Sequence, residues 1–293
     1  MSYDLYFEFH SPVKMPTIID YFSTRRSYQI SGNEFIYKNK ETGVYFAFRF
    51  TENGKKIFRK SLINGHFNIN YCRPSFFGLE AQQELSSIVA ALPCKIHDPQ
   101  MHGMENGPYT NEGFLRGWNF GNRFAVQAIL SQSKHKIWSL PTARLHETWR
   151  WNYELPARSA QYGERQFLPR IMYFGISHAA QTVIVWGDGL PAFLPKVDFV
   201  LMGRSENETP SFSLTAWKTL TDLLQSIGYR EEISGFNLDY SITPDAILSF
   251  IKNMTPTEKS ALTRIPADDI FDEELIRDIP NSGRDLSGQT AIE

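Results

Sequence analysis

The chain has 293 residues, a length that fits two domains or one large domain. Hydrophobic residues make up 42% of it and aromatic residues 14%, which is enough apolar material for a large packed core. The formal net charge of −2 excludes a strongly basic protein that holds nucleic acid through its bulk charge. We therefore expect a globular protein that makes no direct contact with nucleic acid.

The N-terminus and the cysteine content predict a cytoplasmic protein. Residues 2–8 contain neither a basic region nor a continuous apolar stretch, so they do not form a signal peptide. Cys72 and Cys94 are the only cysteines, and two thiols in so long a chain suit a reducing compartment. The longest charge-free run, residues 171–187, is interrupted by polar side chains and fits two strands better than a membrane span.

Residues 1–98 have the pattern of a small α+β domain. Tyr3, Leu5, Phe7 and Phe9 alternate with polar residues, which predicts a strand with one buried face. A helix after Pro16, a hairpin over residues 28–51, a further strand, a helix ended by Pro93 and a last strand follow. This order is typical of a ferredoxin-like sandwich, here with one extra strand.

Residues 98–112 are rich in Gly, Pro and Asn and predict a linker to a second, larger domain at residues 111–265. Asn111 is the expected N-cap of a long helix, and a second helix is expected from Pro141. Residues 168–204 hold three apolar runs, which predict the antiparallel core of this α+β domain. The Gly187–Asp188–Gly189 sequence is expected to be a hairpin turn between two of them.

Residues 266–293 are predicted to be an acidic C-terminal segment, separate from the folded body. From Arg264 to the end there are three arginines and eight acidic residues, so this part carries a charge of −5. Its acidic side chains are candidates for contact with a basic partner. Those we select are Asp268, Asp269, Asp272, Glu273 and Glu274.

Three groups of residues resemble chemical sites, and each has a simpler interpretation. His97, Asp98 and His102 could hold a metal, but their spacing matches no standard zinc pattern, so a solvated linker is the default and we expect no metal or cofactor. His146 and Glu147 lack the second histidine of HExxH, because position 150 is Arg. An enzyme, perhaps a hydrolase, would have to use them with Asp188 in a cleft between the domains.

Asp198 interrupts an apolar strand between Val197 and Phe199. It either faces solvent by strand alternation or needs a buried cation such as Arg170, and alternation favours solvent.

The predicted second helix mixes aromatic and basic side chains around Arg150 and Trp151. Such a mixture can bind single-stranded nucleic acid by stacking, can anchor a protein interface, or can be a core helix with a charged outer side. The overall acidity favours a protein partner over nucleic acid. We therefore select Arg150 and Trp151 as candidate partner-binding residues.

Three short sequences resemble immunity proteins of interbacterial effector systems, including type VI secretion. They are SYDLYF at residues 2–7, NYCRPSFFGLE at residues 70–80 and VWGDGLP at residues 185–191. The resemblance implies a cytoplasmic protein that binds and neutralises a cognate secreted toxin without catalysis. A nuclease is one candidate, because nuclease clefts are basic and an acidic segment over residues 268–278 could steer binding. An adaptor subunit of a secretion apparatus is a further alternative.

Overall fold

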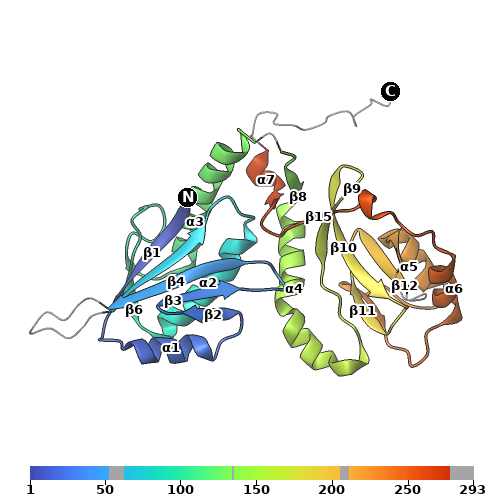
Figure 1. Cartoon of the computed structure of the whole chain (residues 1–293), viewed down its shortest axis with the longest axis horizontal. Helices are drawn as coiled ribbons and strands as arrows, with labels where there is room; N and C mark the ends of the chain where they lie inside the picture. The colour runs from blue at the N-terminus through green and yellow to red at the C-terminus, as the bar shows by residue number, and fades with distance from the viewer. Residues whose placement is uncertain (53–62, 134, 205–210, 278–293) are drawn as a thin grey trace, which may run out of the picture. The chain divides into compact units, whose positions relative to one another are not determined.

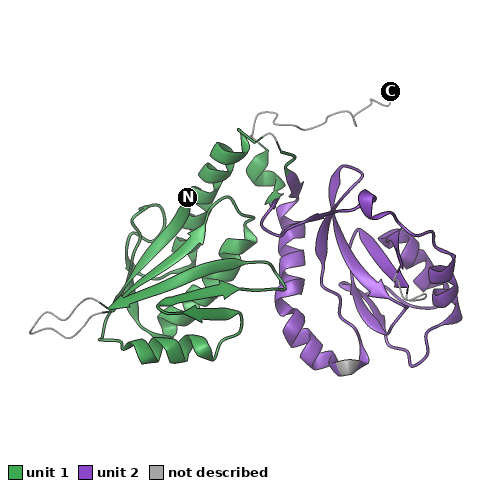
Figure 2. Ribbon diagram, viewed as in Figure 1, with its two compact units in different colours: residues 1–137, 271–293 green, residues 138–270 purple. Residues whose placement is uncertain are grey.

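The computed structural model describes residues 1–52, 63–133, 135–204 and 211–277, and its fold is mixed α and β, as predicted. Contacts divide the chain into two units (Figure 2). Unit 1 comprises residues 1–137 and 271–293, and unit 2 comprises residues 138–270. The chain therefore leaves unit 1 well after the predicted linker and returns to it near its C-terminus. Asp278 and the rest of the predicted acidic segment lie outside the described residues.

Unit 1 is built on a seven-stranded sheet with the strand order β2-β3-β4-β5-β1-β6-β7, in which all neighbouring strands are antiparallel (Figure 1). Its strands are β1 (Ser2–Phe9), β2 (Tyr28–Ser31), β3 (Glu34–Lys38), β4 (Tyr45–Glu52), β5 (Ile63–Asn70), β6 (Cys94–His97) and β7 (Asn106–Pro108). Its helices are α1 (Met15–Ser23), α2 (Phe76–Ala91), α3 (Asn111–Leu130) and α7 (Glu273–Ile276).

The four central strands of this sheet have the predicted ferredoxin-like arrangement. They lie in the order β6-β1-β5-β4, with α1 after β1 and α2 between β5 and β6. The prediction of one extra strand was wrong, because β2 and β3 extend one edge and β7 the other. Residues 28–38 do not form a single strand, because the chain reverses at Gly32, whose φ of 61° is favourable for glycine.

One face of the sheet forms the core of unit 1. Tyr3, Phe48 and Phe67 are fully buried there, as the alternation in β1 predicted. Helix α3 packs on this face through Phe114, whose ring centroid lies 5.7 Å from that of Tyr3. Gly117 permits the close approach, since a Cβ at that position would lie 2.2 Å from the Tyr3 hydroxyl oxygen.

The predicted linker is part of unit 1. Asp98 is fully buried and accepts hydrogen bonds from the Tyr3 hydroxyl (2.7 Å) and from the Met104 backbone N–H (3.1 Å). The N-cap of α3 is Thr110 in place of the predicted Asn111, because the Thr110 hydroxyl accepts a hydrogen bond from the Gly113 N–H (3.0 Å). Polar and glycine-rich composition predicted a spacer, but buried hydrogen bonds fix this segment to the sheet.

Unit 2 contains a five-stranded sheet with the order β13-β12-β10-β9-β15 and a separate pair of strands, β11 and β14. The strands of unit 2 are β8 (Trp138–Leu140), β9 (Met172–Ile176), β10 (Ala179–Gly187), β11 (Ala192–Pro195), β12 (Phe199–Arg204), β13 (Ser211–Ala216), β14 (Gly235–Leu238) and β15 (Thr263–Ile265). Its helices are α4 (Thr142–Tyr162), η1 (Gly163–Arg165), α5 (Trp217–Ser226), α6 (Asp245–Asn253) and η2 (Lys259–Ala261), while β16 (Ile270–Asp272) lies where the chain passes back to unit 1.

The predicted antiparallel core of residues 168–204 is only partly correct. β9 and β10 form the expected antiparallel hairpin, but β10 pairs with β12 in parallel. Gly187–Asp188–Gly189 is not a hairpin turn, since β11 leaves this sheet and pairs with β14. Asp188 and Gly189 have φ values of 49° and 64°, and this left-handed turn redirects the chain. None of the helices within the described residues combines the length and apolarity that crossing a membrane requires.

Candidate functional site

Helix α4 does not present the predicted pair of anchors. Trp151 is only 7% exposed, its indole N–H donates to the Pro169 carbonyl (2.9 Å), and its ring packs in the core of unit 2. Arg150 is exposed. Trp151 is therefore a core residue, and its selection as a surface anchor is corrected: helical periodicity places it on the inner face of α4, where its ring stacks on Phe193 of β11.

The predicted acidic segment is anchored as far as residue 277. Ile270 and Ile276 are buried, and α7 packs against α3. Asp272 is only 1% exposed and accepts a hydrogen bond from the Ser75 backbone N–H (2.8 Å), so it is a structural residue and not a free contact. The remaining candidates lie nearer the surface: Asp269, Glu273 and Glu274 are exposed and Asp268 is half-buried.

The residues of the enzyme alternative all belong to unit 2. Glu147 is largely exposed and pairs with Arg144 (Oε2–Nη1 3.7 Å) on the same helix. Asp188 lies in the turn after β10, where its backbone N–H donates to the Gly203 carbonyl (2.9 Å). His146 is half-buried on α4. Glu147 thus pairs within its own helix, and the Asp188 backbone helps to close the turn after β10.

Asp198 is both partly exposed to solvent and close to a cation, the two alternatives that the sequence left open. Its side chain is partly exposed, and its carboxylate accepts hydrogen bonds from the Thr182 backbone N–H (2.7 Å) and hydroxyl (2.6 Å). The nearby cation is Arg144 (Oδ1–Nη2 3.6 Å) instead of Arg170. This network joins the N-terminal turn of α4 to β10.

The His97–His102 region holds no metal cluster. Among the described residues, no three His, Cys, Asp or Glu side chains are arranged to hold a metal ion. Asp98 points into the core, as given above, whereas the His97 ring hydrogen-bonds to Asn106 and the His102 ring lies 4.0 Å from that of Phe120 between centroids. His97, Asp98 and His102 therefore contact different partners within unit 1.

The solvent-facing side of the unit 1 sheet carries a continuous row of polar and aromatic side chains. Strand register places one residue of the row on each of six adjacent strands. In order from β3 to β7 they are Glu34, Arg49, His66, Tyr6, His97 and Asn106. The Tyr6 ring stacks on that of His66 with 4.8 Å between centroids, and it lies tilted to the His97 ring with 6.2 Å between centroids.

Asp4 fixes the orientation of two neighbours on this face. Its Oδ1 accepts hydrogen bonds from His66 Nε2 (2.8 Å) and Asn68 Nδ2 (2.7 Å), and its Oδ2 accepts one from the Ser2 hydroxyl (2.8 Å). Partial burial raises the pKa of the Asp4 carboxyl, but these hydrogen bonds outweigh burial and hold the pKa below its ordinary value. Asp4 is therefore ionised near neutral pH and acts only as an acceptor.

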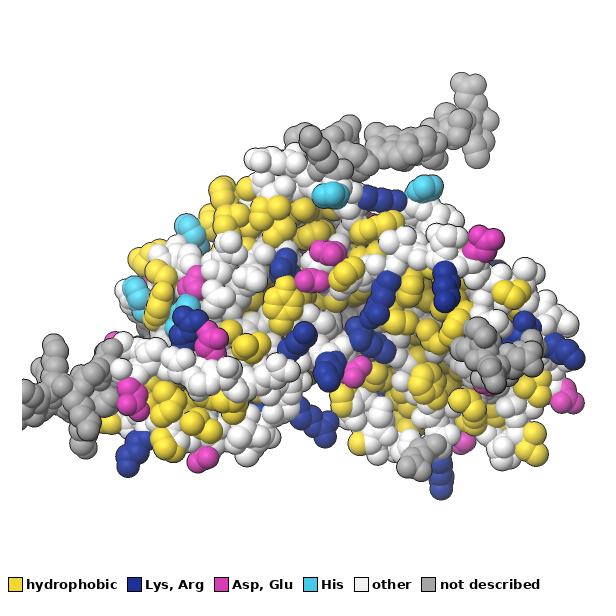
Figure 3. Space-filling view, viewed as in Figure 1, with side chains coloured by type: hydrophobic (Ala, Val, Ile, Leu, Met, Phe, Trp, Pro, Cys, Tyr) yellow, Lys and Arg dark blue, Asp and Glu magenta, His cyan; other side chains and the backbone are white. Residues whose placement is uncertain are grey.

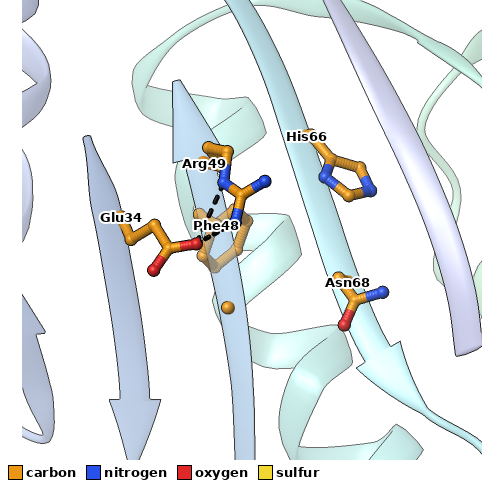
Figure 4. A pocket seen from close by; sticks show the side chains of 6 residues that line it. Glu34, Phe48, Arg49, His66 and Asn68 are labelled. Carbon is orange, nitrogen blue, oxygen red and sulfur yellow. Dashed lines mark hydrogen bonds and ion pairs between the residues drawn. The ribbon is translucent and has the colours of Figure 1, made fainter. Parts of the chain in front are cut away.

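A hollow of about 300 Å³ lies beside this network, and the small side chain of Ala47 on β4 is part of its lining. Figure 4 shows the larger side chains that line it. Its walls are formed by Glu34 and Arg49 on one side and by His66 and Asn68 on the other. Arg49 binds Oε1 of Glu34 through both its Nε (3.0 Å) and its Nη2. We call this feature the Ala47 hollow.

The outer side of α3 carries large apolar side chains that the fold leaves uncovered. Phe120 and Phe124 are 56% and 65% exposed, one helical turn apart, with the exposed Arg123 between them. Met101, 56% exposed, lies in the preceding loop next to His102, which contacts Phe120. Hydrophobic side chains gather over the C-terminal half of α3 (Figure 3). We call Phe120, Arg123 and Phe124 the α3 strip.

Comparisons with protein-family models, with curated proteins and with solved structures gave no match.

Sequence reasoning missed both surfaces. For the α3 strip a signal was present: Phe120 and Phe124 lie on a different side of the helix from Phe114 and Trp118, so the apolar surface of α3 is wider than the buried face. For the Ala47 hollow there was little signal, since its residues come from β3, β4 and β5 and only their register brings them together. Asp4 and His66, separated by 62 positions, illustrate this.

Proposed function

We propose that this chain is a cytoplasmic immunity protein that binds and neutralises a cognate secreted bacterial toxin without catalysis, and that the α3 strip is its main binding surface. The observation that carries the proposal is the exposure of Phe120 and Phe124. Aromatic and arginine side chains dominate the energetic centres of protein interfaces, and the strip combines both. The sequence resemblance to immunity proteins supports the same function.

The inner face of α3 explains why the strip is available to a partner. Phe114, Trp118 and Val126 are fully buried, so the helix is held in unit 1 without help from Phe120 or Phe124. Large apolar side chains that contribute no core contact and stand next to one another commonly mark a protein-binding site. Asp269, Glu273 and Glu274 are exposed, and their negative charges would help to steer a basic toxin.

The test is expression of the toxin-like product of the neighbouring reading frame in a bacterial host, with and without this chain. Co-expression of this chain is expected to restore growth, and the double variant Phe120→Ala/Phe124→Ala is expected to weaken binding by about 100-fold or more and to abolish protection. Ile233→Ala/Ile242→Ala is the matched control, because both side chains are highly exposed in unit 2. Full protection by the α3 variant would exclude the strip, and failure of the chain itself to protect would exclude this toxin as its partner.

A further inference from the structure

The Ala47 hollow, of about 300 Å³, has room for a small polar group, and the residues around it determine its hydrogen-bonding character. Ala47 is an apolar part of the lining, and Glu34, Arg49, His66 and Asn68 are side chains that can form hydrogen bonds (Figure 4). The hollow opens on the solvent side of the sheet, whereas α3 packs on the other side. It is therefore independent of the α3 strip and of the toxin-binding function proposed for it.

His66 presents an acceptor to the hollow. The ionised Asp4 carboxylate can only accept, so the proton in their hydrogen bond is carried by His66 Nε2. In the neutral imidazole the other nitrogen, Nδ1, then has a lone pair and no proton. Figure 4 shows one ring nitrogen of His66 directed toward β4, which carries Ala47 and Arg49.

Asn68 and Glu34 present acceptors as well. Because Asn68 Nδ2 donates to Asp4, its Oδ1 points the opposite way, toward β4 (Figure 4). Glu34 lines the hollow with a carboxylate that receives both Arg49 bonds on Oε1. Acceptors of His66 and Asn68 and the Glu34 carboxylate thus border one small hollow.

The charges around the hollow select a cation. With His66 in its neutral form, Glu34 and Asp4 contribute two negative charges and Arg49 one positive charge, and Arg49 is already bound to Glu34. A group with several N–H donors and a positive charge complements both the acceptors and this balance. We propose that the Ala47 hollow is a binding site for a guanidinium or ammonium group.

Methylguanidinium and methylurea are matched probes for this site, because they have nearly the same shape and differ in charge. Each is titrated at low salt into the ¹⁵N-labelled full chain, and the Asn68 side-chain amide and His66 ring resonances are followed. Methylguanidinium is expected to bind saturably with a Kd of the order of 1–10 mM, as befits so small a ligand, and methylurea at least about ten-fold more weakly. Equal binding of both probes, or no saturable response to either, would overturn the proposal.

Two variants on the same strand and face complete the test. Ala47→Leu fills the hollow with a solvent-facing side chain and is expected to abolish the response, whereas Thr51→Leu places the same side chain further along β4 and is expected to preserve it. A response retained in Ala47→Leu, or lost equally in both, would contradict the assigned position. Agmatine and an arginine-containing tripeptide then distinguish a free amine from a protein side chain. Because none of these measurements uses the toxin, their outcome does not depend on the function proposed for the α3 strip.

Discussion

The Asp272 carboxylate accepts hydrogen bonds from the backbone N–H and the hydroxyl of Ser75, 197 positions earlier in the chain. Ser75 is the N-cap of α2, so a carboxylate from the C-terminal segment lies at the positive end of that helix. Asp272 is buried and Ser75 is partly buried, so this contact holds the returning chain to the body of unit 1.

Asp272→Ala is expected to lower the free energy of unfolding by about 1–3 kcal/mol, because it removes the buried carboxylate that accepts from the partly buried Ser75 N–H at the start of α2. Urea denaturation followed by circular dichroism measures the change. Glu273→Ala is the control, because removing this exposed side chain should change the free energy of unfolding by less than about 0.5 kcal/mol. Equal effects of the two substitutions would show that the Asp272 contact contributes nothing specific.

Asp4→Asn is expected to reduce stability in a pH-dependent way. The pKa of Asp4 in the folded protein lies below its ordinary value of 3.8, so the ionised carboxylate stabilises the fold above that value and loses this contribution as the pH falls through the folded pKa. The stability difference between wild type and variant should therefore be full between about pH 5 and 7 and shrink below about pH 4. Urea unfolding across this pH range is the measurement, and a constant difference would contradict the assignment.

Trp151→Ala and Arg150→Ala should separate the two residues that the sequence grouped together. Loss of the buried Trp151 ring is expected to cost about 3–5 kcal/mol of unfolding free energy, whereas loss of the exposed Arg150 side chain should change it by less than about 0.5 kcal/mol. Thermal unfolding compares the two. If Trp151→Ala were as stable as wild type, its place in the core of unit 2 would be wrong.

Gly117→Ala is expected to destabilise unit 1 by about 1–3 kcal/mol, although alanine favours helices over glycine, because the new Cβ would overlap the Tyr3 hydroxyl. The exposed Asn119 on the same helix provides the control, and Asn119→Ala should leave stability unchanged or slightly raised. Chemical denaturation measures the free energy of unfolding of both variants. A stabilising effect of Gly117→Ala would mean that Tyr3 does not approach α3 so closely.

Local patterns in the sequence were sufficient for much of unit 1. The alternation of Tyr3, Leu5 and Phe7 with polar residues identified β1 and its buried face, and the order of elements identified the ferredoxin-like arrangement. These features depend on near neighbours in the chain, and strand and helix periodicity records them directly. Composition gave a wrong prediction for residues 98–112, because this polar segment is not a linker but forms buried hydrogen bonds, as Asp98 does with Tyr3.

The sequence by itself determined the fold class, the main helices and strands, and which side of β1 is buried. Only the tertiary structure decided that Trp151 and Asp272 are covered, that Phe120 and Phe124 are exposed, and that His66 meets Asp4. The physical reason is that burial and hydrogen-bond partnership are set by segments far apart in the chain. Periodicity assigns a residue to a face of its own element, but the packing of other elements decides whether that face is covered.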